Sequence, residues 1–566
     1  MPHKPELPLI NERNSSNEAI LSKPPSYLVQ LHPHTDEAGD PYYIGTAYDE
    51  EPSEAAREWQ IKDNISRPYL EYVKKVSSIR PDLRYLADWM EVATAPPKWR
   101  FIKLDSANRA RRAALTLVCM LDFREGVLGR KVRVDDISAL HSLLYGAGND
   151  HDNVGVRLFV VEDLSRDVVE AFGARFGIDP SFFRAHISDY LWYNTRDKWY
   201  EIPDLQIDAR RRSFLSIRYT RPLYYLSDAS YEAARLQSGS FNVLRRIVRD
   251  HNEKPRLDAD GSKVGMARSK TSLWIRPNKP NQSGILGILL VDPTTRDGFP
   301  LWGGHRAFSE CPEFGSPAVS TLGAPKDSIY EEVIFWTSKF GEKYLDAVKS
   351  DPTTLAVPAL RMVIAEWLNL AGYVTTRLTQ IDWELERKDY RFHSDGIDSA
   401  LRRLHYWRRH LPAYASMIDA AIDRLFADAP TQSTDHTFIS QRSTLGLLHD
   451  FKAVKDQVEA LQERVDRIVA VATATISIEE NRRSLDQNEL TIAQNRSLTR
   501  LTNLATVLIP MSFVGTFFSM TPDVASLSQT YWIFFIIAVP LTAITLVMGD
   551  YLGSRQMLKR LAAQWL

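Results

Sequence analysis

The sequence predicts a membrane protein with a cytosolic α/β domain, a long helical stalk and two C-terminal transmembrane helices. Three observations support this fold class. Short apolar runs alternate with turn residues before about residue 325, residues 447–509 contain neither glycine nor proline, and two long uncharged segments lie near the C-terminus. With 44% hydrophobic and 25% charged residues, the 566-residue chain has the composition of an ordinary folded protein.

The overall charge and the cysteine content exclude several classes of protein. Seventy basic and 71 acidic residues give a formal net charge of −1, so we expect no nucleic-acid partner. Cys119 and Cys311 are too few for a disulfide framework or a cysteine zinc cluster. No catalytic triad or phosphate-binding glycine loop has a recognisable local signature, so we expect no enzyme activity and no covalently bound cofactor.

The N-terminal half is predicted to contain a flexible region followed by a folded domain. Residues 1–60 are rich in Pro, Asn, Ser, Asp and Glu, which favours flexibility. Residues 61–325 mix strand and helix patterns and are predicted to form the cytosolic α/β domain. The strongest strand predictions fall on residues 157–163, 215–226, 271–277 and 284–292. Residues 249–270 show almost no apolar periodicity and are predicted to be an exposed loop.

Helical periodicity dominates after residue 325. Residues 326–430 are predicted to form a helical hairpin region, and residues 440–500 a stalk helix that runs directly into the membrane. Alternating steps of three and four residues give the stalk an apolar heptad seam of the coiled-coil type: Phe451, Val454, Val458, Leu461, Val465, Ile468, Ala472 and Thr475. The seam favours self-association, although it could equally pack against the preceding hairpin of its own chain, and both can hold.

Two uncharged segments are long enough to cross a bilayer. Residues 501–522 and 524–549 contain no charged side chain, and each exceeds the roughly 20 residues that a membrane-spanning helix needs. We therefore predict a first transmembrane helix at 501–520, an outer loop at 521–530 and a second transmembrane helix at 531–549. A buried helical hairpin in a large core is the alternative.

Basic residues set the predicted orientation. Arg496 and Arg500 precede the first uncharged segment, and Arg555, Lys559 and Arg560 follow the second, whereas the outer loop has no basic residue. Because positive charge stays on the cytosolic side, both termini, including the tail at 550–566, are predicted to be cytosolic.

Motifs in the first span resemble those of a known family. Five groups fall in ungapped register with that family's conserved positions: Leu501-Thr502, Ala505-Thr506, Pro510, Ser512-Phe513-Val514 and Phe518 to Thr521. Together with the stalk and the paired spans, they resemble the CorA family of divalent-cation channels. The resemblance implies a homo-oligomer in a lipid bilayer, a pentamer in that family, through which magnesium or another divalent cation passes passively. It also implies feedback by cytosolic acids that bind the ion, but no residue of this chain is assigned to that role.

One departure from the family lies at the outer end of the first span. The family has Gly-Met-Asn there, whereas this chain has Ser519-Met520-Thr521. The resemblance makes these residues the selectivity entrance, with Asp523 beside them either as a ring that concentrates cations or as a cap of the turn. Thr521 offers a hydroxyl to a hydrated cation but has a shorter reach than an asparagine amide. The alternative function is therefore a non-conducting, membrane-anchored interaction or sensor protein whose N-terminal domain binds an unknown soluble partner.

The resemblance also nominates the residues that line the pore. They are Asn495 at the cytosolic mouth, then Leu498, Thr502, Ile509, Ser512 and Thr516. Their spacing places them on one face of a helix. Leu498 and Ile509 would be apolar constrictions. The alternative is that the hydroxyl groups only bond to backbone carbonyls or join the spans together.

Overall fold

The computed structural model describes most of the chain in separate ranges. They are residues 66–92, 111–124, 127–146, 155–188, 212–250, 261–277, 284–304, 328–339, 341–386, 394–426, 446–519 and 532–547, with a few single positions between them. The regions predicted at 1–60, 521–530 and 550–566 lie outside the described residues.

The chain divides into two compact units, the N-terminal unit of residues 1–469 and the C-terminal unit of residues 470–566. One helix, α18 (Gly446–Phe518), runs through the boundary without interruption. It confirms the continuous helix that the absence of glycine and proline predicts. The first part of α18 is considered with the N-terminal unit and the remainder with the C-terminal unit.

The N-terminal unit is built on one mixed β-sheet. Its strands are β1 (Leu117–Arg124), β2 (Val127–Val134), β3 (Val156–Glu162), β4 (Phe214–Tyr225), β5 (Ile247–Arg249), β6 (Lys263–Ile275), β7 (Ile285–Val291) and β8 (Phe299–Pro300). They lie in the order β2-β1-β3-β7-β6-β4-β8, and β5 pairs with β6. Only β3 and β7 pair in parallel among the described strands. The sheet includes all four segments for which the sequence predicts strands most strongly.

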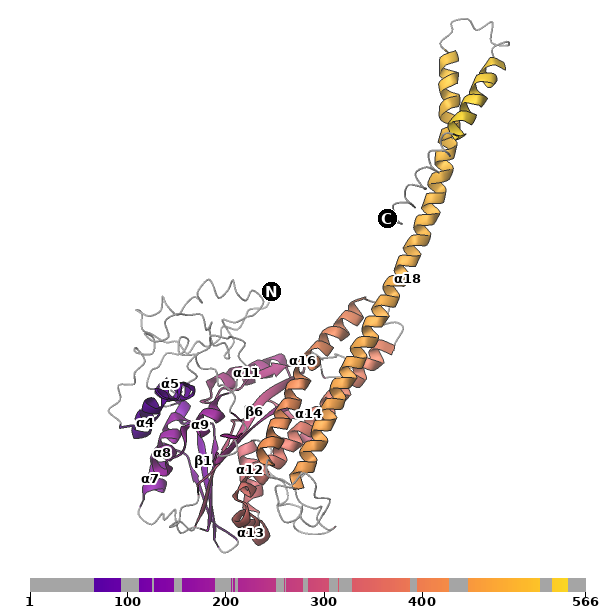
Figure 1. Ribbon diagram of the computed structural model, residues 1–566. Coiled ribbons are helices and arrows are strands. Elements are labelled where there is room, and N and C mark those ends of the chain that lie inside the picture. The colour runs from indigo at the N-terminus through magenta and orange to yellow at the C-terminus, as the bar shows by residue number, and fades with distance from the viewer. Residues whose placement is uncertain are drawn as a thin grey trace, which may run out of the picture. The chain divides into compact units, whose positions relative to one another are not determined.

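A first layer of helices covers one face of this sheet (Figure 1). It consists of α4 (Pro68–Ser77), α5 (Arg84–Val92), α7 (Ile137–Tyr145), α8 (Arg166–Phe176) and α9 (Pro180–Ile187), with the short 3-10 helix η2 (Pro81–Leu83) between α4 and α5. Alternate sheet residues such as Met120, Phe159 and Ile288 pack into one apolar core with these helices. Because the strand side chains alternate, the same strands also have apolar residues for a second layer.

The second layer consists of later segments of the chain. It contains α12 (Ile329–Ser338), α13 (Glu342–Ser350), η6 (Pro352–Ala356), α14 (Val357–Glu386) and α16 (Ser394–Leu425). Gly287 of β7 lets η6 approach closely, because a Cβ atom there would lie 2.8 Å from Cδ1 of Leu355. The N-terminal unit is thus a three-layer α/β/α structure, which confirms the predicted α/β class.

Smaller elements complete the sheet edge. Helix α11 (Asp228–Ser240) and β5 enclose a satellite core around Tyr225, Tyr231 and Ile247, and η4 (Leu301–Gly303) follows β8. The loop predicted at 249–270 is wrong in its last eight residues, because Lys263 to Lys270 form the first part of β6 and pair with β4.

The apolar seam of α18 is buried by its own chain. Phe451 and Val465 are fully buried, and Val454, Val458, Leu461 and Ile468 are at most 7% exposed. The ring of Phe451 contacts that of Phe426 at the end of α16, with centroids 6.2 Å apart. Ion pairs at the edges of the seam join Lys455 to Asp419 of α16 and Arg464 to Asp382 of α14. The interpretation that the seam packs against the preceding hairpin of its own chain is therefore confirmed for residues 451–468, and self-association through the seam stays a prediction.

Candidate functional site

The candidate site lies in the C-terminal unit, where α18 continues through Pro510. A proline inside a helix gives no N–H to the carbonyl four residues earlier, here that of Thr506, but α18 still extends to Phe518. A second apolar helix covers Trp532–Val547. The end of α18, from Leu501 to Phe518, and the second helix lie within the two segments for which the sequence predicts transmembrane helices.

The second helix packs on one side of α18. Val514 is 5% exposed and Pro510 is buried, and opposite them Ala538 is fully buried and Thr542 is 9% exposed. A Cβ atom at Gly515 would lie 3.8 Å from the ring of Phe534, which is an ordinary van der Waals distance. The two helices thus pack in normal contact at this position.

All six predicted pore residues lie on another side of α18. Asn495, Leu498, Thr502, Ile509, Ser512 and Thr516 are exposed in the single chain. At about 100° per residue, they fall within a sector of about 100°, whereas Val514 lies roughly opposite and Pro510 lies to one side. We call these six residues the pore stripe. The stripe points away from the chain's own second helix and is free to face other molecules.

Ala505 is absent from the predicted set but belongs to the same sector. It lies seven residues after Leu498 and seven before Ser512, and its side chain is half-buried. The seven-residue spacing is the signal that identifies it. Ala505 therefore adds a small methyl group to this sector between Thr502 and Ile509.

The hydroxyl groups of the stripe bond to the backbone of their own helix. Thr502 Oγ1 donates to the Leu498 carbonyl at 2.8 Å, Ser512 Oγ to the Ile509 carbonyl at 2.9 Å, and Thr516 Oγ1 to the Ser512 carbonyl at 2.7 Å. This is the arrangement that the alternative interpretation of these residues predicts. Because each proton is used internally, each oxygen presents its lone pairs as an acceptor.

The predicted selectivity entrance is described only at its first residue. Ser519 is exposed and lies in a turn just after α18, where its backbone N–H donates to the Gly515 carbonyl at 3.0 Å. Met520, Thr521 and Asp523 lie outside the described residues.

Within the described ranges, two helices are long and apolar enough to span a membrane by length and composition, Pro352–Glu386 and Gly446–Thr516. The apolar part of the first is 72% buried, so it is a core helix of the N-terminal unit, whereas only 11% of the apolar part of the second is buried. The exposed apolar surface of α18 therefore distinguishes it from α14 and fits contact with lipid.

Comparison with known proteins agrees with this organisation. The model of a family described as "CorA-like Mg2+ transporter protein" matches residues 328–549, which contain α12 to α18 and the second apolar helix. This part of the chain is similar to the CorA-like family. The family description associates the region with transport of a divalent cation and with an integral membrane location. No curated protein matches the sequence.

One solved structure gives a more distant comparison with the CorA-like region and the domain before it. The complete CorA magnesium transporter from Methanocaldococcus jannaschii is 13% identical, and the match covers 76% of this chain and 96% of that one. Its TM-score is 0.30, which is too low to establish a common arrangement of the two chains.

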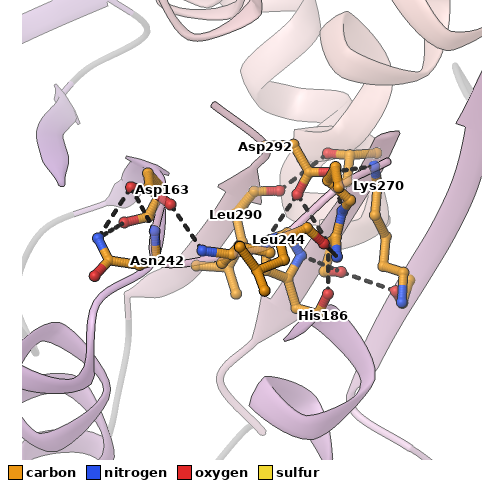
Figure 2. A network of polar contacts seen from close by, with 12 residues as sticks. Asp163, His186, Asn242, Leu244, Lys270, Leu290 and Asp292 are labelled. Carbon is orange, nitrogen blue, oxygen red and sulfur yellow. Dashed lines mark hydrogen bonds and ion pairs between the residues drawn. The ribbon is translucent and has the colours of Figure 1, made fainter. Parts of the chain in front are cut away.

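A buried polar network lies before the CorA-like region, at the ends of β3 and β7 (Figure 2). Asp292 accepts hydrogen bonds from Arg245 Nε at 2.5 Å and from the backbone N–H of Lys270 at 2.6 Å. Arg245 also donates to the His186 carbonyl at 2.6 Å, and Lys270 Nζ to the Ala185 carbonyl at 2.5 Å. These bonds attach the end of α9 to the sheet, so we assign the network a structural role.

Two neighbouring acids at the end of β3 are deeply buried. Asp163 accepts hydrogen bonds from the backbone N–H groups of Asn242 and Val243, at 3.1 and 3.0 Å, yet burial still raises its pKa to about 7. Burial, together with the charge of Asp163, raises the pKa of Glu162 to about 8. Among the described residues, no donor lies within hydrogen-bond distance of Glu162 Oε1. The pair therefore binds protons near neutral pH.

The ion-binding acids that the family resemblance implies are not found in the described part of the chain. There, no group of three or more His, Cys, Asp and Glu side chains could hold a metal ion.

Proposed function

We propose that the protein is a homo-oligomeric channel through which hydrated divalent metal cations, magnesium first, cross a membrane passively. The observation that carries this proposal is the position of the pore stripe. Six residues of one sector of α18 are exposed, uncharged and turned away from the chain's own second helix. The similarity of residues 328–549 to the CorA-like family supports the same function.

Oligomerisation follows from the incomplete covering of α18. Two helices of one chain cannot enclose a path, so the stripe needs copies of itself to form a closed wall. Other sides of the two helices carry large exposed apolar residues, including Leu504, Leu508, Trp532 and Ile536, which suit lipid or neighbouring copies. The number of copies in the proposal, five, comes from the family resemblance.

The chemistry of the stripe suits a cation that keeps its water shell. Mg²⁺ releases its waters reluctantly, and those waters are hydrogen-bond donors. Thr502, Ser512 and Thr516 offer acceptor oxygens, because their own protons are bonded to backbone carbonyls. Leu498 and Ile509, 60% and 65% exposed, place apolar rings between the polar ones, where loss of water would stop conduction.

In this proposal the cation enters from the outer side, past Ser519, Met520, Thr521 and Asp523. Both termini are cytosolic, as the flanking basic residues favour. Thr521 accepts from the cation's waters in place of the family's asparagine, and Asp523, repeated around the ring, raises the local cation concentration.

The altered entrance favours one competing function. With Ser519-Met520-Thr521 in place of Gly-Met-Asn, the protein could keep the architecture without conducting, and serve as an anchored interaction or sensor protein. The uncharged stripe favours conduction, since an anchor does not need a polar face inside the bilayer.

Cation flux into liposomes separates the two functions. Purified protein is tested with magnesium, cobalt, nickel and sodium, beside the variants Ser519→Gly, Thr521→Asn and the double change. Flux of divalent cations through the unaltered protein supports the proposal. Flux only in the double variant would show an intact path with a closed entrance. Absence of flux in all four proteins, in a folded and oligomeric preparation, would favour the function of an anchored interaction or sensor protein.

A further inference from the structure

Strand β2 (Val127–Val134) forms one edge of the sheet in the N-terminal unit. It lies at the end of the strand order, and among the described strands it pairs only with β1. Five of its eight residues are exposed. An edge strand presents backbone N–H and C=O groups to which a further strand can be added. The edge of β2 is therefore a candidate docking surface.

The side chains of β2 give this edge a positive charge. Arg130, Lys131 and Arg133 are exposed, and the strand contains no acid. Arg124, also exposed, lies at the end of β1 beside the start of β2. Arg133 pairs with Glu331 of α12 at 2.5 Å, yet half of its side chain stays exposed. Basic groups thus lie at both ends of the strand.

Apolar side chains on one face of β2 are incompletely covered. Val134 is buried in the core that the sheet shares with the first helical layer, and Val132 packs against that core but is only half-buried. Leu128, four residues earlier on the same face, is also half-buried. A strand added beside β2 would extend this face and cover both half-buried side chains.

The charge of the edge restricts which strand can be added. Two copies of β2 would bring basic side chains together, and like charges on neighbouring strands are destabilising. A strand with acids at its ends meets the opposite charge instead. The edge therefore favours an extended segment that has acids on both sides and strand-forming residues at alternate positions.

One segment of the chain, outside the described residues, has this pattern in its sequence. Residues 24–56 contain no lysine or arginine, and their acids fall in two clusters, three within 36–40 and four within 49–54. Between the clusters, residues that favour strands occupy alternate positions: Tyr42, Ile44, Thr46 and Tyr48. We call residues 36–54 the acidic segment.

The acidic segment can reach β2 of its own chain. Helix α4, which begins two residues after Ser66, packs against α8, as does α7, and α7 also contacts β2. Neighbouring packed helices lie about 8–10 Å apart, so the start of α4 is a few tens of Å from β2. Residues 49–65, which connect Tyr48 to Ser66, span roughly 55 Å when fully extended. The connection is therefore long enough.

We propose that the edge of β2 binds the acidic segment of the same chain as an added strand, with residues 42–48 paired to β2. The alternating row that contains Ile44 covers Leu128 and Val132, and the acid clusters lie beside the basic groups at the two ends of β2. Backbone hydrogen bonds supply affinity and the charges supply selectivity. The sheet edge is thereby closed to strands of other proteins. The inference does not depend on conduction.

Amide hydrogen exchange of the full-length protein in detergent tests the pairing. Ile44→Pro removes a backbone N–H from the middle of the added strand. The amides of β2 that point away from β1 should then exchange at least tenfold faster than in the unaltered protein. Ile10→Pro, a proline N-terminal to the acidic segment, is the matched control and should leave β2 unchanged. Equal exchange of β2 in the unaltered protein and Ile44→Pro would overturn the proposal, whether the edge is open or covered by a second copy.

A synthetic peptide of residues 36–54 identifies the occupant. Added in excess to the full-length Ile44→Pro protein, it should restore slow exchange of β2, whereas the same peptide carrying Ile44→Pro should not. Failure of the first peptide would overturn the assignment to this segment. Restoration by both peptides would show that charge alone binds and would overturn the added strand.

Reversal of one charge tests the selectivity. Lys131→Glu places an acid in the middle of the edge and should raise the exchange rate of β2 at least tenfold at low salt. Because salt screens exposed charges, 0.5 M sodium chloride should raise the rate in the unaltered protein too. Lys349→Glu, at an exposed lysine of α13, is the matched control. Unchanged exchange in Lys131→Glu would overturn the electrostatic part of the proposal.

Discussion

Two stretches of one helix, α18, use the same heptad spacing for different purposes. In the first, Phe451 to Ile468, the seam is apolar and buried by α14 and α16 of the same chain. In the second, Asn495 to Thr516, the spaced residues are mostly polar and exposed. The heptad therefore marks a face that needs a partner, and the side chains on it decide whether that partner is the chain itself, water or another copy.

The difference has an energetic basis. Burial of a Val, Leu or Phe side chain stabilises by about 1.5–3 kcal/mol, so the first stretch folds onto its own hairpin. The hydroxyls and amides of the second stretch gain nothing from a dry contact, and remain available to a hydrated ion. Substitutions in the first stretch should change stability, and those in the second should change transport.

The largest expected effect is on stability, from the first stretch. Phe451→Ala removes a fully buried ring and should lower the free energy of unfolding by about 3–5 kcal/mol. Denaturant unfolding of the full-length protein in detergent measures it. Lys452→Ala, on the exposed side of the same turn, is the control and should change stability by less than about 0.5 kcal/mol. Equal small effects would mean that the chain does not bury its own seam.

Proton binding should distinguish the N-terminal unit from the stripe, which has no titratable side chain. The raised pKa of Glu162, about 8, means that the folded protein holds a proton that the unfolded chain loses near pH 4.5. This group's stabilisation is full below pH 4.5 and is lost as the pH rises through about 8. Glutamine carries no charge at either pH, so the variant avoids the cost of ionising Glu162 in the folded protein. The free energy of unfolding that Glu162→Gln gains over the unaltered protein should therefore be larger at pH 8.5 than at pH 5.5, by a few kcal/mol.

Thermal unfolding of the full-length protein at the two pH values measures this effect. Glu342→Gln, an exposed glutamate at the start of α13, is the matched control and should leave the pH dependence unchanged. The same pH profile in the unaltered protein and Glu162→Gln would show that Glu162 keeps an ordinary pKa.

An intermediate effect is expected at a constriction of the stripe. Ile509→Ala should raise divalent-cation flux about tenfold, because the smaller side chains leave a wider opening that holds water more readily. A tenfold change corresponds to roughly 1.4 kcal/mol of barrier. Stopped-flow flux in liposomes measures it. Leu504→Ala, an exposed residue of α18 off the stripe, should leave the flux unchanged. A response at Leu504 alone would place the path on another side of α18.

The smallest effect is expected at the edge of the buried seam. Arg464 and Asp382 form an ion pair at 2.6 Å, but both side chains are partly exposed. Asp382→Asn should lower the free energy of unfolding by less than about 1 kcal/mol, since water screens the pair. A loss comparable to that of Phe451→Ala would show that charge, rather than apolar burial, holds α18 on its hairpin.

The sequence predicts elements whose signal is local. Buried strands such as β3 and β7 are largely apolar runs. The family resemblance nominates the pore residues, and the helical period places them on one face of α18. The first half of β6 escapes this reasoning because Lys263 and Lys270 look like loop residues. Their partners, Asp228 and the Ala185 carbonyl, come from distant elements, and these contacts make their burial tolerable.

Other features depend on information that a single sequence lacks. Strand β2 is mostly exposed and carries Arg130, Lys131 and Arg133, so it has no apolar run to reveal it. The partner of the α18 seam is equally hidden, because a heptad is the same whether another copy or the chain's own hairpin covers it.

The central claim is that cations pass along the pore stripe. Magnesium flux before and after chemical modification of a cysteine on the stripe tests it most directly. The variants Ser512→Cys, on the stripe, and Leu504→Cys, off it, are reconstituted in liposomes and treated with a positively charged thiol reagent. Modification is verified by mass. The account predicts flux in both before treatment, and loss of flux in Ser512→Cys alone after it. Undiminished flux through fully modified Ser512→Cys, or no flux through the unaltered protein, would contradict it.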